Sequence, residues 1–207
     1  LIGFYLQPAV GGIVLSRGFW QRFAAIDNVI AIKVAPFNRY RTLDVVHGVV
    51  AAEAEDRVSL YTGNDDHILL DLLTPFTARR AGEDVVVRFR GGLLGHWSVW
   101  VKPAVDYLAQ AHAAVAAGAV DAELLQLDSQ ITDANGALFD VLNDFSGCIA
   151  GCHEVLRRQG LLQGTWCLNP DEAMSPGQTE ALDRVIADYP HLCDDDFVAE
   201  NLQRWLA

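Results

Sequence analysis

Short runs of almost uninterrupted apolar residues constrain the fold more than any other feature of this sequence. They are rich in β-branched and aromatic side chains and cover residues 1–6, 29–35, 58–62 and 91–99. Strands that are apolar without alternation are typical of a parallel sheet covered on both faces. The segments between them are long enough for crossover helices and cover residues 15–26, 41–54 and 65–73. We therefore predict repeated strand–loop–helix units around a parallel sheet.

Helix-capping residues and a charged interruption refine this prediction. Asn38 or Thr42 is expected to cap the second helix, and Asn64 or Asp65 the third, because their side-chain oxygens can accept from free backbone N–H groups. The charged segment at residues 79–90 is expected to form an exposed insertion or a hairpin before the fourth strand.

The second half of the chain, residues 104–207, is predicted to be a helical appendix without strands. Its first helical segments cover residues 104–118, 121–142 and 148–158. Ser175 and Gln178 form an S-x-x-Q start for a later helix that runs to Asp188. We expect two regions, with the sheet confined to residues 1–103.

Charge and composition exclude several classes of protein. The 207 residues are 51% hydrophobic and 20% charged, as a globular domain requires, and the formal charge of −12 removes the basic surface that nucleic-acid binding needs. No apolar run approaches the roughly 18 residues of a membrane-spanning helix. We expect a cytoplasmic protein with neither nucleic acid nor a membrane as partner.

The four cysteines show no zinc-finger spacing. They are Cys148, Cys152, Cys167 and Cys193. Reduced, buried thiols are the simplest interpretation. The alternative is a metal site in which Cys148 and Cys152 are joined by His153, and it needs further ligands that the sequence does not supply.

Lys33 is the candidate catalytic residue that the pattern singles out, because it interrupts the apolar run VIAIKVA. Lysine is almost never fully buried, and burial lowers the pKa of its ammonium group and yields the neutral amine that attacks a carbonyl to form an imine. The alternative is a packed stem whose charged end reaches solvent. Tyr5, at the end of the first strand, can relay protons in such a reaction, or can simply be a packed aromatic residue.

Other polar groups fall at the ends of the third and fourth strands, where parallel β/α folds gather their reactive residues. Asp65 and Asp66 are metal ligands or, more simply, helix caps, so we expect no metal site. His96 is either a polar contact in the pocket or a packed histidine with a satisfied hydrogen bond.

Four motifs in order resemble a known family. They are GFYLQPAVGG, NVIAIKVAPFN, LYTGNDD and GGLLGHWSV, and the later segment LNPDEAMSPGQTEALDRVIADY adds a likeness to a last helix. Together they resemble the dihydrodipicolinate synthase and N-acetylneuraminate lyase family of class I aldolases. That family carries a Y-N-V-P-x-R-T-G-like strand end, an N-I-x-G-I-K-E-like lysine strand, an S-G-D-D-like turn and a G-G-x-G-like eighth strand. Tyr5 precedes Lys33 by 28 residues, in register with the lysine strand.

The resemblance implies that the four strands are strands five to eight of a (β/α)8 TIM barrel. Lys33 would form the Schiff base with a 2-oxo acid such as pyruvate or a sugar-acid derivative, with no cofactor beyond that covalent imine. Tyr5 would relay protons, Gly63 would bring backbone near the substrate, and Leu94 would lie close to the imine. The resemblance also implies a homodimer or homotetramer.

The chain departs from the family pattern around the substrate pocket. Val10 replaces the arginine that binds a second carboxylate in some members, and Val34 replaces the glutamate after the lysine. Arg39 and Arg41 are candidates for a replacement cation or are ordinary loop and helix-start charges. Asn38 in the same segment is, with Arg39 and His96, a candidate for binding the substrate.

Three functions follow from these observations. The first is an aldolase, synthase or dehydratase that forms an imine on Lys33. The second is a non-catalytic binding or regulatory protein that keeps the barrel. The third is a metal-assisted lyase that uses Asp65, Asp66 and His96. Because the chain begins at Leu1 inside a predicted strand and a full barrel takes about 250 residues, we expect the natural protein to extend at least about a hundred residues upstream.

Overall fold

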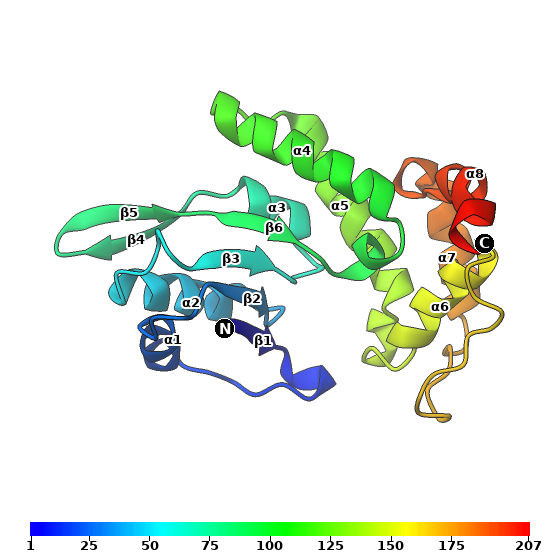
Figure 1. Cartoon of the computed structure of the whole chain (residues 1–207), viewed down its shortest axis with the longest axis horizontal. Coiled ribbons are helices and arrows are strands. Elements are labelled where there is room, and N and C mark those ends of the chain that lie inside the picture. The colour runs from blue at the N-terminus through cyan, green and yellow to red at the C-terminus, as the bar shows by residue number, and fades with distance from the viewer. The chain divides into compact units, whose positions relative to one another are not determined.

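The computed structural model describes all 207 residues as a mixed α/β chain with a four-stranded parallel sheet. The strands pair in the order β1 (Ile2–Leu6), β2 (Ala31–Ala35), β3 (Ser59–Thr62) and β6 (Phe89–Gly92), and all neighbours are parallel (Figure 1). The spatial order follows the chain order, as it does when each successive β/α unit adds its strand beside the previous one. The predicted parallel sheet is confirmed.

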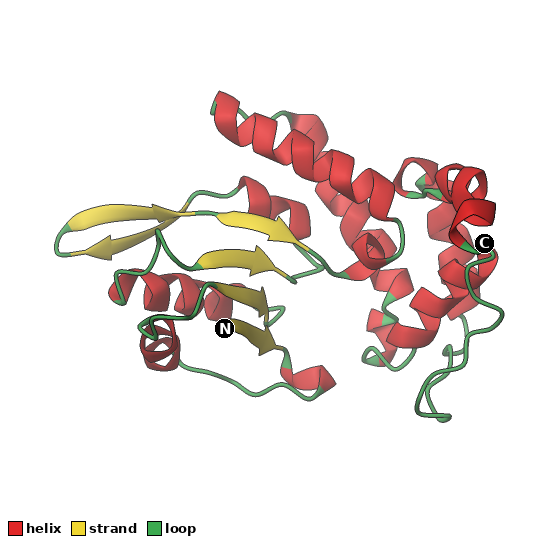
Figure 2. Cartoon of the chain, in the orientation of Figure 1, coloured by secondary structure: helices red, strands yellow, loops and turns green.

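The chain divides into two compact units. The first joins Leu1–Leu94 to Ala111–Asp121, and the second joins Gly95–Gln110 to Ala122–Ala207. All strands belong to the first unit and lie between Ile2 and Gly92; Figure 2 shows them in yellow. The division after Leu94 falls nine residues before the boundary expected at residue 103.

Three helices of the first unit lie between the parallel strands, as predicted. They are α1 (Arg17–Ala24), α2 (Arg39–Ala51) and α3 (Ile68–Leu73), with ends within three residues of those expected. Ser16 caps α1 by accepting from the Phe19 N–H, and Asn38 caps α2 by accepting from the Arg41 N–H. Neither Asn64 nor Asp65 is the N-cap of α3, because the position before Ile68 is His67, whose side chain makes no capping bond.

Only one face of the sheet is fully buried near its first strand. In β1, Gly3 and Tyr5 are buried, whereas Ile2 is 69% and Phe4 51% exposed. Trp20 of α1 packs on Tyr5, with ring centroids 5.0 Å apart, so the covered face is the one beneath the helices. The prediction of two covered faces is therefore wrong for β1. The apolar composition of a strand does not show whether one or both of its faces are covered by other elements.

The charged segment before the fourth parallel strand forms a hairpin, which was one of the two predicted structures. Strands β4 (Phe76–Arg80) and β5 (Glu83–Val87) are antiparallel and joined by Ala81 and Gly82. Both joining residues have positive φ angles, 52° and 90°, as a two-residue turn matched to the strand twist requires.

The fourth parallel strand is shorter than predicted. We expected a strand over residues 91–99, but β6 ends at Gly92 and Gly95–Ser98 forms the short 3-10 helix η2. Gly95 has a φ angle of +59°, which ends an extended chain. The apolar residues of this segment form a buried turn, because a short apolar run is compatible with either a strand or a buried turn.

The second unit is helical, as predicted. Its helices are α4 (Val101–Ala117, whose last turns belong to the first unit), α5 (Ala122–Leu138), α6 (Cys148–Arg158), α7 (Gln178–Asp188) and α8 (Asp195–Trp205), with short 3-10 turns η3 (Val141–Asn143) and η4 (Pro190–Leu192); a further turn, η1 (Pro8–Val10), lies in the first unit. Helix α5 ends four residues earlier than expected, because Asp140 adopts a left-handed conformation with a φ angle of 56°.

Two helix starts in this unit differ from expectation. The S-x-x-Q start is half realised: the Ser175 N–H donates to Gln178 Oε1 at 3.2 Å, while Gly177 is the N-cap of α7. Helix α8 was not predicted, and of its residues only Val198 is buried. No helix in the chain has both the length and the apolar character needed to cross a membrane.

Candidate active site

Lys33 lies in the middle of β2, with one residue on each neighbouring strand in register with it. The parallel pairing places Phe4 of β1 opposite Lys33 on one side and Tyr61 of β3 on the other. Residues paired in this way project to the same face of a sheet. The Lys33 ammonium lies 5.0 Å from the centroid of the Phe4 ring, within cation–π range. Lys33 therefore stands between two aromatic side chains on the less covered face.

Gly63 gives the lysine its space. A Cβ atom placed on Gly63 would lie 2.9 Å from Lys33 Cε and 2.9 Å from Ala35 Cβ, closer than side chains approach one another. The bare backbone after β3 thus borders the end of the lysine side chain. The structure brings Gly63 and Lys33 together, as the strand ends led us to expect.

Partial burial makes Lys33 a better nucleophile than a surface lysine. Its side chain is neither fully buried nor exposed, and desolvation lowers the pKa of its ammonium group from the ordinary value of 10.5. No carboxylate is among the causes of that shift, so no ion pair opposes the effect of desolvation. A larger share of neutral amine is available near neutral pH as a result.

Tyr5 is not beside Lys33, which corrects the expected pairing. Tyr5 is in register with Val34, the residue after Lys33, so its side chain leaves the opposite face of the sheet. Its hydroxyl is held by the backbone of Leu15, 3.2 Å from the N–H and 3.3 Å from the carbonyl oxygen. The 28-residue spacing fixes the strands on which the two residues lie but not the faces to which they point.

Tyr61 is the phenol that shares the face of Lys33, and we did not select it from the sequence. A Cβ atom on Gly91 would lie 2.9 Å from Tyr61 Cε2, so Gly91 leaves room for the ring as Gly63 does for the lysine. Desolvation raises the pKa of Tyr61 above 10.0, which keeps its proton in place. Its signal in the sequence is the two-residue separation from Gly63, which puts both on one face of β3.

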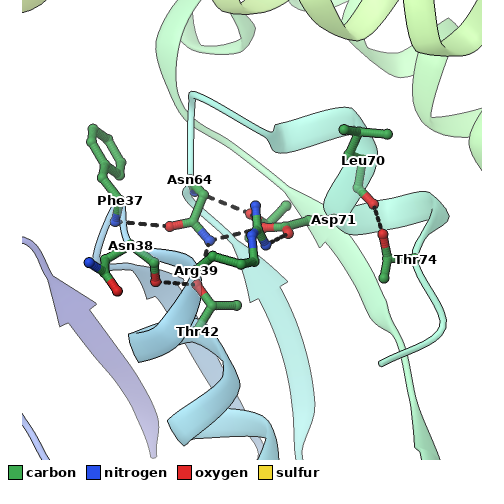
Figure 3. A network of polar contacts seen from close by, with 9 residues as sticks. Phe37, Asn38, Arg39, Thr42, Asn64, Leu70, Asp71 and Thr74 are labelled. Atoms are coloured by element: carbon green, nitrogen blue, oxygen red, sulfur yellow. Dashed lines mark hydrogen bonds and ion pairs between the residues drawn. The ribbon is translucent and has the colours of Figure 1, made fainter. Parts of the chain in front are cut away.

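A buried polar network fastens the loop after β2 to the loop after β3 (Figure 3). Asp71 is at its centre and is fully buried. It accepts from Thr62 Oγ1 at 2.6 Å and from Asn64 Nδ2 at 2.9 Å, and it forms an ion pair with Arg39. Asn64 also donates to Thr42 Oγ1 at 3.2 Å. Side chains from β3, α2 and α3 thereby hold the loop that follows the lysine strand β2 to the loop that follows β3.

The same network supports an unusual backbone conformation. Phe37 has a φ angle of 48°, which is rare for a bulky residue and strained. Its N–H donates to Asn64 Oδ1 at 3.1 Å (Figure 3). Held in this way, the chain turns sharply from the lysine strand into α2.

Asn38 and Arg39 serve this framework. Asn38 Oδ1 accepts from the Arg41 N–H at 3.1 Å as the cap of α2. The Arg39 guanidinium faces Asp71 but keeps 37% of its side chain exposed, so part of it remains open to an anion. Leu94 is partly buried at the end of the first unit. Asn38 forms neither an anion pocket nor a contact with Lys33.

Asp65 and Asp66 form an acidic pair with perturbed titration. Asp65 is 3% exposed, and desolvation followed by the neighbouring charge of Asp66 raises the pKa of its carboxyl to about 8. Desolvation also raises the pKa of Asp66, against the opposing effects of His67 and Arg39. His, Cys, Asp and Glu side chains gather nowhere in groups of three that could hold a metal ion.

His96 belongs to the second unit and is fully buried there. Its N–H donates to Asn135 Oδ1 at 2.9 Å, and its ring Nδ1 lies 2.7 Å from the same oxygen, whereas Nε2 has no partner. Burial lowers the pKa of the imidazole to about 4, against the raising effect of Asn135. The neutral ring with a satisfied Nδ1 matches the packed-histidine alternative.

The cysteines are free thiols of intermediate exposure. Cys152 Sγ lies 3.8 Å from Ser98 Oγ, and His153 Nδ1 lies 3.1 Å from the Trp166 carbonyl oxygen and 3.9 Å from Cys167 Sγ. His153 therefore points toward the Cys167 segment.

Comparison with known protein families and with curated protein sequences gives no match, so the family resemblance rests on the four motifs and the later helix.

Proposed function

We propose that this protein is a class I, Schiff-base lyase that acts on a 2-oxo acid such as pyruvate or a sugar-acid derivative. The observation that carries the proposal is Lys33: a partly desolvated amine in the middle of a parallel strand, beside a glycine that leaves its end free. Lys33 makes neither an ion pair nor a hydrogen bond that would explain a structural role; its amine lies over the Phe4 ring.

The chemistry needs only groups that this chain carries. A neutral Lys33 amine adds to the carbonyl carbon of the oxo acid, and loss of water gives a protonated imine that withdraws electrons from the neighbouring carbon. Carbon–carbon cleavage, addition or loss of a hydroxyl group can follow from that intermediate. Arg39, at the start of α2 and 37% exposed, is a candidate for binding an anionic group of the substrate.

We further propose that the sheet is strands five to eight of a (β/α)8 barrel of the dihydrodipicolinate synthase and N-acetylneuraminate lyase family, assembled as a homodimer or homotetramer. The parallel order β1-β2-β3-β6 supports this assignment, as does the open face that carries Phe4, Lys33 and Tyr61. In a closed barrel that face would be the interior. The proposed activity uses no metal and no cofactor, in a cytoplasmic protein.

Trapping of the imine tests the proposal. The full chain is incubated with pyruvate or another 2-oxo acid and reduced with borohydride, and the modified residue is found by mass spectrometry. We expect an adduct on Lys33 that Lys33→Ala abolishes. Lys102→Ala, which removes an exposed lysine paired with Asp106, should leave the adduct unchanged. An adduct that survives Lys33→Ala, or no adduct with any oxo acid, would sink the proposal.

A non-catalytic binding protein is the second candidate, and the position of Tyr5 favours it. The phenol expected to relay protons is enclosed on the other face of the sheet, and Val10 lies where a carboxylate-binding arginine is expected. This candidate predicts that an oxo acid shifts the thermal unfolding temperature while Lys33 stays unmodified after reduction. Turnover that depends on Lys33 would exclude it.

A further inference from the structure

The Lys33 amine cannot complete imine formation alone. Addition to a carbonyl leaves an oxygen that must gain a proton, and departure of that oxygen as water needs a second proton. A positioned acid on the same face of the sheet as the amine is therefore required for fast reaction. Tyr5, whose side chain leaves the other face, is excluded from this role by its place in the fold.

Tyr61 meets the geometric condition. Its Cα is the register partner of Lys33 on the adjacent strand, and neighbouring strands lie about 4.8 Å apart. Lys33 Cε lies beside Gly63, the next residue after Tyr61 on that face, whereas Lys33 Nζ lies 5.0 Å from the centroid of the Phe4 ring on β1. Lys33 and Tyr61 thus project from adjacent strands onto the same face of the sheet.

Two glycines shape the space around this pair. Any side chain on Gly63 would collide with Lys33, and any side chain on Gly91 would collide with the Tyr61 ring. Tyr61 is partly buried, and Lys33 is flanked on its other side by the Phe4 ring. The two register partners of Lys33 are Phe4 and Tyr61, and Phe4 carries no proton to give, so the phenol is the only acid in register with the lysine.

We propose that Tyr61 is the catalytic acid that transfers protons during imine formation on Lys33; this inference rests on the proposed lyase function. The neutral amine forms a bond to the carbonyl carbon, and the carbonyl electron pair moves to oxygen, which takes the Tyr61 proton. The phenolate recovers a proton from the new ammonium, which gives the neutral carbinolamine. Tyr61 then protonates the hydroxyl, which leaves as water while the nitrogen lone pair forms the C=N bond. Solvent restores the phenol, and no oxidation or reduction occurs.

Timed trapping tests this assignment with pyruvate as the probe. Samples of the full chain are quenched with borohydride at intervals, and the adduct on Lys33 is quantified by mass spectrometry. We expect Tyr61→Phe to slow adduct formation about a hundredfold, at the lower end of general acid–base effects, without preventing the final adduct. Tyr5→Phe and Tyr40→Phe, the latter at an 82% exposed position, should react at the wild-type rate.

The dependence on pH separates proton transfer from mere displacement of the lysine. The rate should rise with pH as Lys33 loses its proton, and the midpoint of that rise should be the same in wild type and Tyr61→Phe. A Tyr61→Phe rate equal to wild type overturns the inference, as does a slower rate accompanied by a shifted midpoint. An absent adduct in the wild type instead refutes the lyase itself, so the two failures are distinguishable.

Discussion

Removal of the Asp71 carboxylate should destabilise the first unit strongly, because three side chains depend on it. In Asp71→Ala, the buried donors of Thr62 and Asn64 lose their acceptor, and Arg39 loses its ion-pair partner. An unsatisfied buried donor costs about 1–3 kcal/mol. The Thr62 hydroxyl can rotate and Asn64 keeps its bond to Thr42, so the lower part of that range applies to each.

The sum is a loss of about 3 kcal/mol in the free energy of unfolding, with little added by Arg39, which is 37% exposed and can be rehydrated. That is a large share of the stability of an ordinary domain. The measurement is urea unfolding followed by circular dichroism, with the stability taken from midpoint and slope. Asp71→Asn, which keeps one acceptor oxygen, should fall between Asp71→Ala and the wild type.

The matched control is Asp84→Ala. Asp84 also pairs with an arginine, Arg79, at 3.3 Å, but both side chains lie on the exposed hairpin, with 73% of Arg79 and 65% of Asp84 accessible. Exposed ion pairs contribute at most about 1 kcal/mol. If Asp71→Ala lost no more stability than Asp84→Ala, the buried network would not be the element that holds the β2 and β3 loops together.

Three further outcomes follow from single positions. Gly63→Ala should reduce Lys33 adduct formation at least about tenfold, because the new methyl group would displace the lysine end; Gly136→Ala, which meets no atom, should not. His96 should contribute a loss of about 3 kcal/mol in stability as pH drops from about 6.5 to about 4, because the unfolded chain then binds a proton that folded His96 refuses; Asp65 acts in the opposite direction over this range, so the contribution is measured as the difference between urea titrations of the wild type and of His96→Gln. The effect of Asp65 on stability has the opposite sign: because its pKa is raised to about 8, its contribution to stability falls as pH rises from about 4 toward 8. Asp65→Asn should remove this contribution. If the dependence of stability on pH were unchanged in His96→Gln or in Asp65→Asn, the role assigned to that residue would be contradicted.

Local sequence was sufficient for most elements of the first unit. The apolar runs and the caps at Ser16 and Asn38 are determined by neighbouring residues, because strand propensity, helix propensity and capping act over a few positions. Lys33 was found for the same reason, since a charge inside an apolar run is visible in one dimension. The misjudged fourth strand shows the limit, because a short apolar segment around Gly95 fits a strand or a buried turn equally well.

Helix α8 marks a second limit. Val198, Leu202 and Trp205 recur at the i, i+4, i+7 spacing of one helix face, but of the eleven residues of α8 only Val198 is buried, so this pattern does not correspond to a fully buried face. The polar network around Asp71 was also invisible, because its members come from separate elements and meet only when the loops after β2 and β3 lie side by side.

The sequence by itself determined the parallel β/α order of the first unit and the position of a lysine inside an apolar strand. Tertiary structure decided which tyrosine shares a face of the sheet with that lysine. Strand register is set by packing across the whole sheet, and a shift of one residue sends a side chain to the opposite face. Tyr5 and Tyr61 are both strand tyrosines near Lys33 in the sequence pattern, yet only Tyr61 is in register with it.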